Sequence, residues 1–240
     1  RRKFDHHQVD ALKRENGITY CSFGLLWKEF GKDFLKKRNI EYIDEVFEGI
    51  DKDLIEGIDA DDNGIFPKIE ADYKVKTTSS IVKLFNPSFN SDEDESEQFL
   101  KAEALAKMIF EEEILYINGK VIAAKKVECL LENRNKEKKY LVLDEFLPYE
   151  ETLLNVEDAN NILFVAYPSN RGGYAIKTVP KSLEDRTARM DFPEEWAGLC
   201  NEELENVSKI NGLKFCHLGR FIVSCTNKEV VYKVLDYMCK

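Results

Sequence analysis

The sequence contains no apolar run that approaches the roughly 18–20 residues that a membrane-spanning helix needs. It also lacks a charged start followed by an apolar stretch, which is the pattern of a secretory signal. Its six cysteines are scattered, and they form neither a C-x-x-C pair nor a zinc-finger spacing. We therefore expect an intracellular protein without a membrane partner, whose thiols are reduced and do not form disulfides or a structural zinc site.

Positive charge is in deficit. The chain has 35 Lys and Arg residues against 45 Asp and Glu residues, a formal net charge of −10. A protein that coats long duplexes by neutralising phosphates needs the opposite balance. An enzyme that acts on short strands remains compatible with this charge, because bound cations and local basic tracts can supply the attraction. Internal repeats and the Walker and dinucleotide-binding motifs are also missing.

Helical and strand patterns occupy different parts of the chain. Apolar residues recur at three- and four-residue steps in residues 21–39, in residues 41–64 up to an Asn-Gly stop signal, and in two further segments, 97–117 and 121–139. Short β-rich runs broken by Pro, Asn and Gly follow. A chain of 240 residues is long enough for two domains. We expect an α/β fold, with a first domain over residues 1–150 and a smaller α+β sheet domain over residues 151–240.

Two of the three histidines lie side by side behind an aspartate in the segment KFDHHQ, residues 3–8. If this segment ends a short strand, adjacent side chains point to opposite faces of it. One imidazole could then bind a metal while the other faces a substrate. A mixed set of His and Asp ligands favours Mn²⁺ or Mg²⁺. An exposed N-terminal tail is the alternative interpretation.

A cluster of three aspartates, Asp59, Asp61 and Asp62, falls at the predicted C-terminus of a helix. The helix dipole disfavours negative charge at that end, so the carboxylates need a cation or hydrogen bonds. A metal shared with the histidine pair would meet this need. A surface loop or a calcium-type turn is the alternative, although the full calcium-loop spacing with its distal Glu is absent.

Several segments occur in the order seen in one protein family. They are FDHHQ, YCSFGLLWKEFG, IDADDNGI, TTSSIVKLFNPSFN, AIKTVP and FPEEWAGL, followed by a histidine and the pair FI. Through them the chain resembles, over nearly its whole length, the melanocyte-proliferating-gene family of DHH-type metal-dependent hydrolases. In that family, segments with further His and Asp ligands precede FDHHQ, and this sequence does not contain them. We expect a preceding N-terminal segment or a second copy of the chain to complete the site.

The resemblance implies a DHH phosphoesterase-like fold, in which a partial parallel-sheet α/β domain with a helical middle precedes the smaller α+β domain. It implies a metal-dependent phosphodiester hydrolase that acts as a 3′-to-5′ exonuclease on single-stranded RNA and uses two Mn²⁺ or Mg²⁺ ions. The nucleus or the mitochondrion is the implied location, with the cytoplasm as an alternative.

The resemblance also implies the roles of individual residues. The catalytic residues would be Asp5, His6, His7 and Asp59. The metal ligands within this chain would be His6, Asp59 and, in second place, Asp62. Substrate contacts would come from His7, His217 and Asn227.

Two other functions stay open. A non-catalytic family member would keep the fold and act as a binding or scaffold protein. A small-molecule phosphoesterase acting on nucleotides would share the metal chemistry and differ in what the C-terminal domain holds. Metal titration separates the first alternative from the exonuclease, and competition between oligonucleotide and mononucleotide substrates separates the second.

Overall fold

The computed structural model describes residue 4 and residues 12–240. The chain divides into two compact units, one ending at Ile122 and the other formed by Ala123–Lys240. The division falls inside a helix, earlier than the domain boundary that the sequence predicted after residue 150. Its physical reason is that Ala123, Val127 and Leu131 pack in the core of the second unit.

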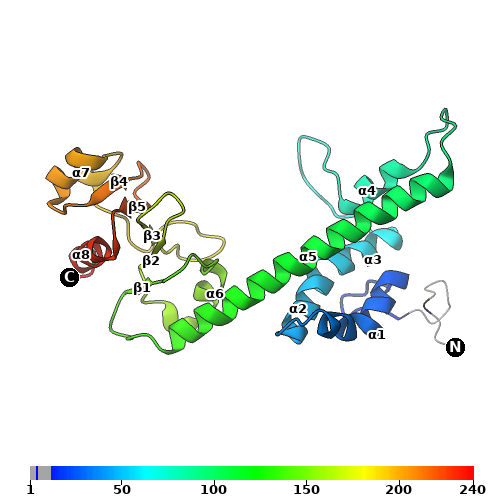
Figure 1. Ribbon diagram of the computed structural model, residues 1–240, viewed down its shortest axis with the longest axis horizontal. Helices are drawn as coiled ribbons and strands as arrows, with labels where there is room; N and C mark the ends of the chain where they lie inside the picture. The colour runs from blue at the N-terminus through cyan, green and yellow to red at the C-terminus, as the bar shows by residue number, and fades with distance from the viewer. Residues whose placement is uncertain (1–3, 5–11) are drawn as a thin grey trace. The chain divides into compact units, whose positions relative to one another are not determined.

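The described part of the first unit is helical (Figure 1). Its elements are α1 (Ser22–Lys37), α2 (Ile43–Ile50), the π-helical turn η1 (Asp51–Ile55), α3 (Glu56–Asp62), α4 (Thr78–Val82), the 3-10 turn η2 (Lys83–Phe85) and the first part of α5 (Glu95–Glu132). No named strand occurs in this part, which contains only an isolated bridge between Lys13 and Thr19. The partial parallel sheet expected for the first domain is therefore not seen among these residues, and the segment FDHHQ, expected to end one of its strands, is described only at Phe4.

One apolar cluster holds the helices of the first unit together. Trp27 and Leu35 of α1 meet Val46 and Ile50 of α2 and Ile114 of α5 there, all fully or almost fully buried. The rings of Trp27 and Phe47 stack at 5.1 Å. A fully buried side chain of this size stabilises the fold by roughly 1.5–3 kcal/mol relative to an exposed one.

The helical pattern predicted for residues 41–64 is confirmed, with one interruption. Helices α2 and α3 are joined without a break by the π-helical turn η1, which begins at Asp51. The predicted stop signal is also confirmed, because α3 ends at Asp62 and Gly64 adopts a positive φ of 74°. Glycine takes this left-handed conformation without steric cost.

The sequence pattern suggested two helices between residues 97 and 139, and this prediction is wrong. A single helix, α5, runs over 38 residues from Glu95 to Glu132 (Figure 1). The pair Asn118-Gly119, which resembles a stop signal, lies within it because Ile117 and Val121 on either side pack in the core of the first unit. Among the described residues, no helix combines the length and the apolar character that crossing a membrane requires.

The second unit is built on a five-stranded sheet with the order β1-β2-β3-β5-β4. Strand β1 is parallel to β2, and all other neighbours are antiparallel, so the mixed sheet and its helices confirm the α/β class. Its elements are β1 (Tyr140–Val142), α6 (Glu150–Asn155), η3 (Glu157–Ala159), β2 (Phe164–Pro168), β3 (Tyr174–Thr178), η4 (Glu194–Trp196), α7 (Asn201–Ser208), β4 (Leu213–Cys216), β5 (Ile222–Cys225) and α8 (Lys228–Met238).

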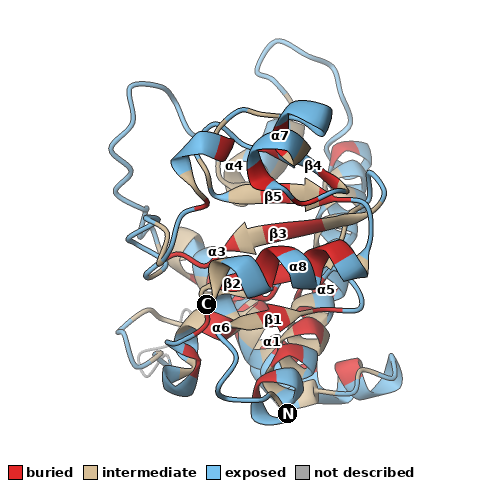
Figure 2. Cartoon of the chain, turned by 90° about the vertical axis from the view of Figure 1, so that its left-hand side faces the viewer, coloured by how far each residue is buried: buried red, intermediate tan, exposed pale blue. Residues whose placement is uncertain are grey.

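Alternating side chains divide the sheet into two faces. On one face, Phe164, Ile176 and Val223 form a core with α7 and α8, and Figure 2 looks onto this α8 side. On the other face, Val165 packs with α6 and the end of α5. That second core includes no residue of β5 or β4. A cavity of about 580 Å³ lies there, lined by residues of β2, β3, β4 and β5.

The outer edge of β4 is paired with a neighbouring segment. The amide of Gly198 donates to the carbonyl of Cys216 at 3.1 Å, and the amide of Cys216 donates to the carbonyl of Leu199 at 3.0 Å. Cys200 and Phe215 form an antiparallel bridge. These bonds satisfy backbone groups that an edge strand would otherwise expose.

Candidate functional site

The structure describes some of the predicted site residues and not others. Asp5, His6 and His7 lie outside the described residues. Asp59 and Asp62 belong to the first unit, and His217 and Asn227 belong to the second. The roles of all these residues as metal ligands, catalysts or substrate contacts stay predictions.

Asp59 lies in the middle of the short helix α3 and is completely buried, with an exposed fraction of 0%. Its Oδ2 accepts hydrogen bonds from Nε of Arg14 at 2.9 Å and from Nη2 of the same residue at 2.7 Å. Its Oδ1 accepts a hydrogen bond from the backbone amide of Cys21 at 2.9 Å. A buried carboxylate of this kind needs a cation and hydrogen bonds, and here the cation is the arginine Arg14.

Arg14 stands among three carboxylates. It forms a two-point ion pair with Asp51, with Nη2 at 2.8 Å from Oδ1 and Nη1 bonded to Oδ2, and it lies 4.0 Å from Glu56. Its guanidinium also lies 4.4 Å from the ring centre of Tyr20. Burial opposes the charged guanidinium, but the hydrogen bonds to Asp51 and Asp59 raise the pKa of Arg14 above its ordinary value. Arg14 is therefore a permanent cation at this position.

The N-terminus of α1 completes the surroundings of Asp59. A Cβ atom added to Gly24 would lie only 2.3 Å from Oδ1 of Asp59, so the close approach of the helix to the carboxylate requires a glycine. Burial and the contact with Asp59 raise the pKa of the Cys21 thiol to about 11. The side-chain amide of Asn63 donates through Nδ2 to the carbonyl of Thr19 at 2.9 Å, which ties the same segment to the end of α3.

These contacts determine whether the described residues fit a Mn²⁺ or Mg²⁺ ion. The negative charge of the Asp59 carboxylate is compensated by the guanidinium of Arg14 and not by a metal ion. Among residue 4 and residues 12–240, no group of three or more His, Cys, Asp and Glu side chains is arranged to hold a metal ion. A metal ion at Asp59 therefore requires that Arg14 leaves the carboxylate and that further ligands come from outside the described residues.

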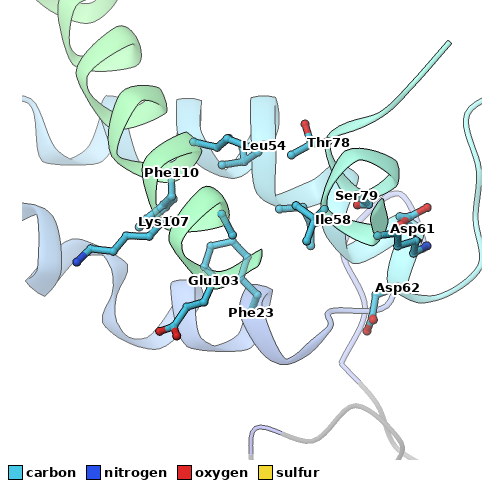
Figure 3. A pocket seen from close by; sticks show the side chains of 14 residues that line it. Phe23, Leu54, Ile58, Asp61, Asp62, Thr78, Ser79, Glu103, Lys107 and Phe110 are labelled. Atoms are coloured by element: carbon cyan, nitrogen blue, oxygen red, sulfur yellow. Dashed lines mark hydrogen bonds and ion pairs between the residues drawn. The ribbon is translucent and has the colours of Figure 1, made fainter. Parts of the chain in front are cut away.

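Asp61 and Asp62 line a different feature, a cavity of about 700 Å³ in the first unit (Figure 3). Apolar side chains from α1, η1, α3 and α5 form most of its wall, among them Phe23, Leu54 and Phe110. Asp61 lies 3.2 Å from Lys83. Asp62 is exposed, whereas Asp59 is buried and is not part of this wall. The two aspartates predicted as metal ligands thus differ in exposure, and their grouping at one metal ion stays a prediction.

His217 lies on the sheet of the second unit and lines the 580 Å³ cavity described above. Its Nδ1 accepts a hydrogen bond from the amide of Gly219 at 2.9 Å, so the proton of the neutral imidazole is on Nε2. Its ring lies 4.4 Å from that of Phe221 and 6.3 Å from that of Phe215. The histidine therefore presents an N–H donor within an aromatic group.

Asn227 has a local structural role and is not part of the cavity wall. Its side-chain oxygen accepts a hydrogen bond from the amide of Val230 at 3.1 Å, which caps the N-terminus of α8. An asparagine at this position stabilises a helix by roughly 0.5–2 kcal/mol relative to alanine.

Sequence reasoning missed Arg14 and the aromatic residues of the sheet face. Arg14 lies in a polar segment, KRENG, without any motif, so no sequence signal connects it to Asp59, 45 residues away. Tyr167 and Ser224 could have been placed on one face of the sheet from the sequence. The signals were the alternation of side chains along β5 and the turn residues between β2 and β3. Their grouping with Phe146 and Phe215 depends on tertiary structure.

Comparisons with known proteins agree on one family. A family model described as "Uncharacterised protein family (UPF0160)", with the name MYG1 exonuclease, matches residues 1–238. A MYG1 protein of Dictyostelium discoideum is 29% identical over 95% of this chain and 75% of its own length. A MYG1 protein of Saccharomyces cerevisiae is 28% identical over 96% of this chain and 77% of its own length.

A Homo sapiens protein named MYG1 exonuclease is 28% identical over 95% of this chain and 68% of its own length. No solved structure matches the chain. The family match spans nearly every residue, and the resemblance read from the sequence is thereby confirmed. The chain belongs to the MYG1 exonuclease family, UPF0160.

Proposed function

We propose that the protein is a metal-dependent phosphodiester hydrolase that trims single-stranded RNA from the 3′ end. The observation that carries this proposal is the family match over residues 1–238, together with relatives named MYG1 exonuclease. The RNA substrate and the 3′-to-5′ direction come from the resemblance of the motifs to DHH-type hydrolases. On the same resemblance, we place the protein in the nucleus or the mitochondrion.

The metal ligands in this proposal are His6 and Asp59, with Asp62 in second place, and a preceding segment or a second copy of the chain supplies the remainder. When bound, Mn²⁺ or Mg²⁺ lowers the pKa of a water molecule and polarises the phosphate. Asp5 orients His6, and His7 donates a hydrogen bond to the phosphoryl oxygens. Arg14 must leave Asp59 before a metal ion binds there, because the guanidinium occupies Oδ2.

A DHH phosphoesterase-like fold, which the resemblance of the motifs implies, is also part of the proposal. The first unit carries the ligands, and the α+β unit holds the strand through His217. The exposed position of His217 in the wall of a 580 Å³ cavity suits such a contact. The volume lies within the range of ordinary ligand pockets, which is about 300–1,000 Å³.

A binding or scaffold protein without hydrolytic activity is the second candidate, and one observation favours it. Arg14 satisfies the carboxylate of Asp59 without a metal ion, and the buried pair is a complete structural interaction. In this case Asp59 orders the start of α1 and has no catalytic role. The two candidates differ in whether Mn²⁺ binds to the chain.

The decisive experiment is Mn²⁺-dependent shortening of a 5′-labelled single-stranded RNA. The parent chain is compared with His6→Ala, with Asp59→Asn and with Asp61→Asn, a matched control whose half-buried carboxylate pairs with Lys83. The proposal expects a ladder of 3′-trimmed products that the first two substitutions abolish and the third leaves intact. No trimming by the parent chain, together with no Mn²⁺ binding by calorimetry, would support the scaffold role. A 3′-labelled RNA tests the direction, because 3′-end trimming releases its label as mononucleotide.

A further inference from the structure

The sheet face of the second unit has an uncovered part with a distinct composition. The floor of the cavity there includes Ala175 of β3 and Ser224 of β5, which are small and bring a ligand close to the strands. Two aromatic groups flank it. Phe146 and Tyr167 form an edge-to-face pair at 5.2 Å on the β2 side, and Phe215 and His217 form another at 6.3 Å on the β4 side.

These aromatic rings are available for contact. Phe146 is 57% exposed and Phe215 is 40% exposed, a large apolar surface to leave in water. Strands β3 and β5 lie between the two groups. Three strand spacings of about 4.8 Å therefore separate β2 from β4, roughly 14 Å in all. The two aromatic groups thus form the two sides of a groove on the sheet. An extended polymer with planar side groups can lie across this groove.

Charge on this surface is opposite to that of the whole chain. No Asp or Glu residue lines the cavity, although 45 of the 240 residues are acidic. Arg171, at the tip of the β2–β3 hairpin, and Lys214, on β4, both line it. Among the described residues neither of these side chains pairs with a carboxylate. Lys177 of β3 lies outside the cavity and is paired with Glu150 at 2.9 Å.

We propose that this groove binds single-stranded nucleic acid, with bases stacked on Phe146 and Phe215 and phosphates beside Arg171 and Lys214. The proposal rests on the proposed function, since it names the surface that holds the strand. Exposed aromatic faces and unpaired cations are the two components of single-strand binding surfaces. The Nε2–H group of His217 adds a hydrogen-bond donor to this surface. Duplexes bind more weakly, because paired bases are stacked on each other and cannot stack on the rings.

The test is fluorescence anisotropy with the 240-residue chain, EDTA and a labelled eight-nucleotide RNA, so that no hydrolysis occurs. Phe146→Leu and Phe215→Leu remove a ring but keep an apolar side chain, and each is expected to weaken binding about tenfold. Arg171→Gln and Lys214→Gln are each expected to reduce the slope of log Kd against log salt by about 0.7. The controls are Tyr232→Leu and Lys233→Gln, which change exposed residues of α8 on the other side of the sheet and should leave the affinity unchanged.

Three probes identify what the groove recognises. An abasic oligonucleotide of the same length, the RNA in duplex form and a labelled hexaglutamate peptide should all bind more weakly than the single strand. Equal binding of the abasic strand or the peptide overturns base stacking, and no measurable binding of the single strand overturns the groove altogether. If both leucine variants bind the single strand with affinities within twofold of the parent, the proposed groove is also overturned. Because both rings are exposed, a thermal melt of each variant should match the parent and confirm the fold.

Failure of this inference and failure of the proposed function give different results. If the groove binds RNA but the chain does not shorten it in Mn²⁺, the inference stands and the exonuclease activity fails. If the chain shortens RNA and the leucine variants neither bind more weakly nor raise the KM for trimming, the exonuclease stands and the groove fails.

Discussion

The guanidinium of Arg14 bonds through Nε and Nη2 to a single oxygen of the fully buried Asp59, at 2.9 and 2.7 Å. The side chain of Arg14 is 7% exposed and that of Asp59 is 0% exposed. Removing one partner of such a pair leaves a buried charge without compensation. The pair therefore connects the stability of the first unit to the state of a candidate metal ligand.

Replacement of Arg14 by glutamine is expected to destabilise the protein by about 3–5 kcal/mol, because Asp59 and Asp51 lose their cation. Urea unfolding monitored by circular dichroism measures the loss. The matched control is Lys83→Gln, which removes a surface partner of Asp61 and should cost no more than about 1 kcal/mol. A loss for Arg14→Gln as small as that of the control would show that the buried pair is not needed.

Mn²⁺ should restore part of the stability that Arg14→Gln loses, if a metal ion can take the place of the guanidinium. A ligand that binds only the folded state raises its stability in proportion to the logarithm of the ligand concentration. The double variant Arg14→Gln/Asp59→Asn lacks the carboxylate and should not respond to Mn²⁺. Equal responses of the single and double variants would locate the bound metal elsewhere.

Gly24→Ala is expected to destabilise the first unit, because the added Cβ would lie within 2.3–2.7 Å of the three carboxylate atoms of Asp59. The cost of such overpacking is typically about 1–3 kcal/mol. Gly57→Ala is the matched control, since it lies within α3 and its Cβ would meet nothing within 4 Å. That substitution should stabilise the protein by roughly 0.5–1 kcal/mol through helix propensity. Thermal melts of the two variants should move in opposite directions.

Stability should fall as the pH rises from about 9 to about 11. Burial raises the pKa of the Cys21, Cys216 and Cys225 thiols from 9.0 to about 11. In this window the unfolded chain loses these protons before the folded chain does, so the unfolded state binds fewer protons and gains relative stability. Urea midpoints between pH 8 and pH 10.5 measure the slope. Cys225→Ala should reduce the slope and the exposed Cys129→Ala should not, and an identical slope in both would contradict the assignment.

Asn227→Ala is expected to cost about 1 kcal/mol of stability through the lost cap of α8, and Asn227→Ser should retain most of it. The same variants test the substrate contact predicted from the sequence. If Asn227 only caps the helix, both variants bind the eight-nucleotide RNA with the parent affinity. A weaker affinity in Asn227→Ser, which keeps the cap, would assign the side chain to the strand.

The sequence was sufficient for local structure wherever apolar spacing dominated. The amphipathic spacing of residues 21–39 predicted α1, and the β-rich runs after residue 139 predicted each of the five strands. The continuity of α5 was not predictable, because an Asn-Gly pair is a stop signal in isolation and only the packing of Ile117 against the first core overrides it. Tertiary contacts, and not local sequence signals, therefore determine that α5 is continuous.

The candidate site was predictable only in part. The spacing of the aspartates correctly required a compensating charge, since a carboxylate at a helix C-terminus is unfavourable. The identity of that charge could not follow from the sequence, because Arg14 reaches Asp59 through tertiary contact over 45 residues. Asp61 is two positions after Asp59 and therefore faces another side of α3, whereas Asp62 is three positions after it, on the same side of the helix but exposed. Asp61 and Asp62 both line another cavity.

The pairing of residues 198–200 with β4 has a consequence for how copies of this protein meet one another. An unpaired edge strand is a template on which a second chain can add by backbone hydrogen bonds, and this is a common first step of aggregation. Here the carbonyl and amide of Cys216 are already bonded to Gly198 and Leu199. At that edge the sheet cannot be extended without first losing these bonds. Self-association through β4 is therefore disfavoured while the fold is intact, even with the aromatic face of the sheet open to ligands.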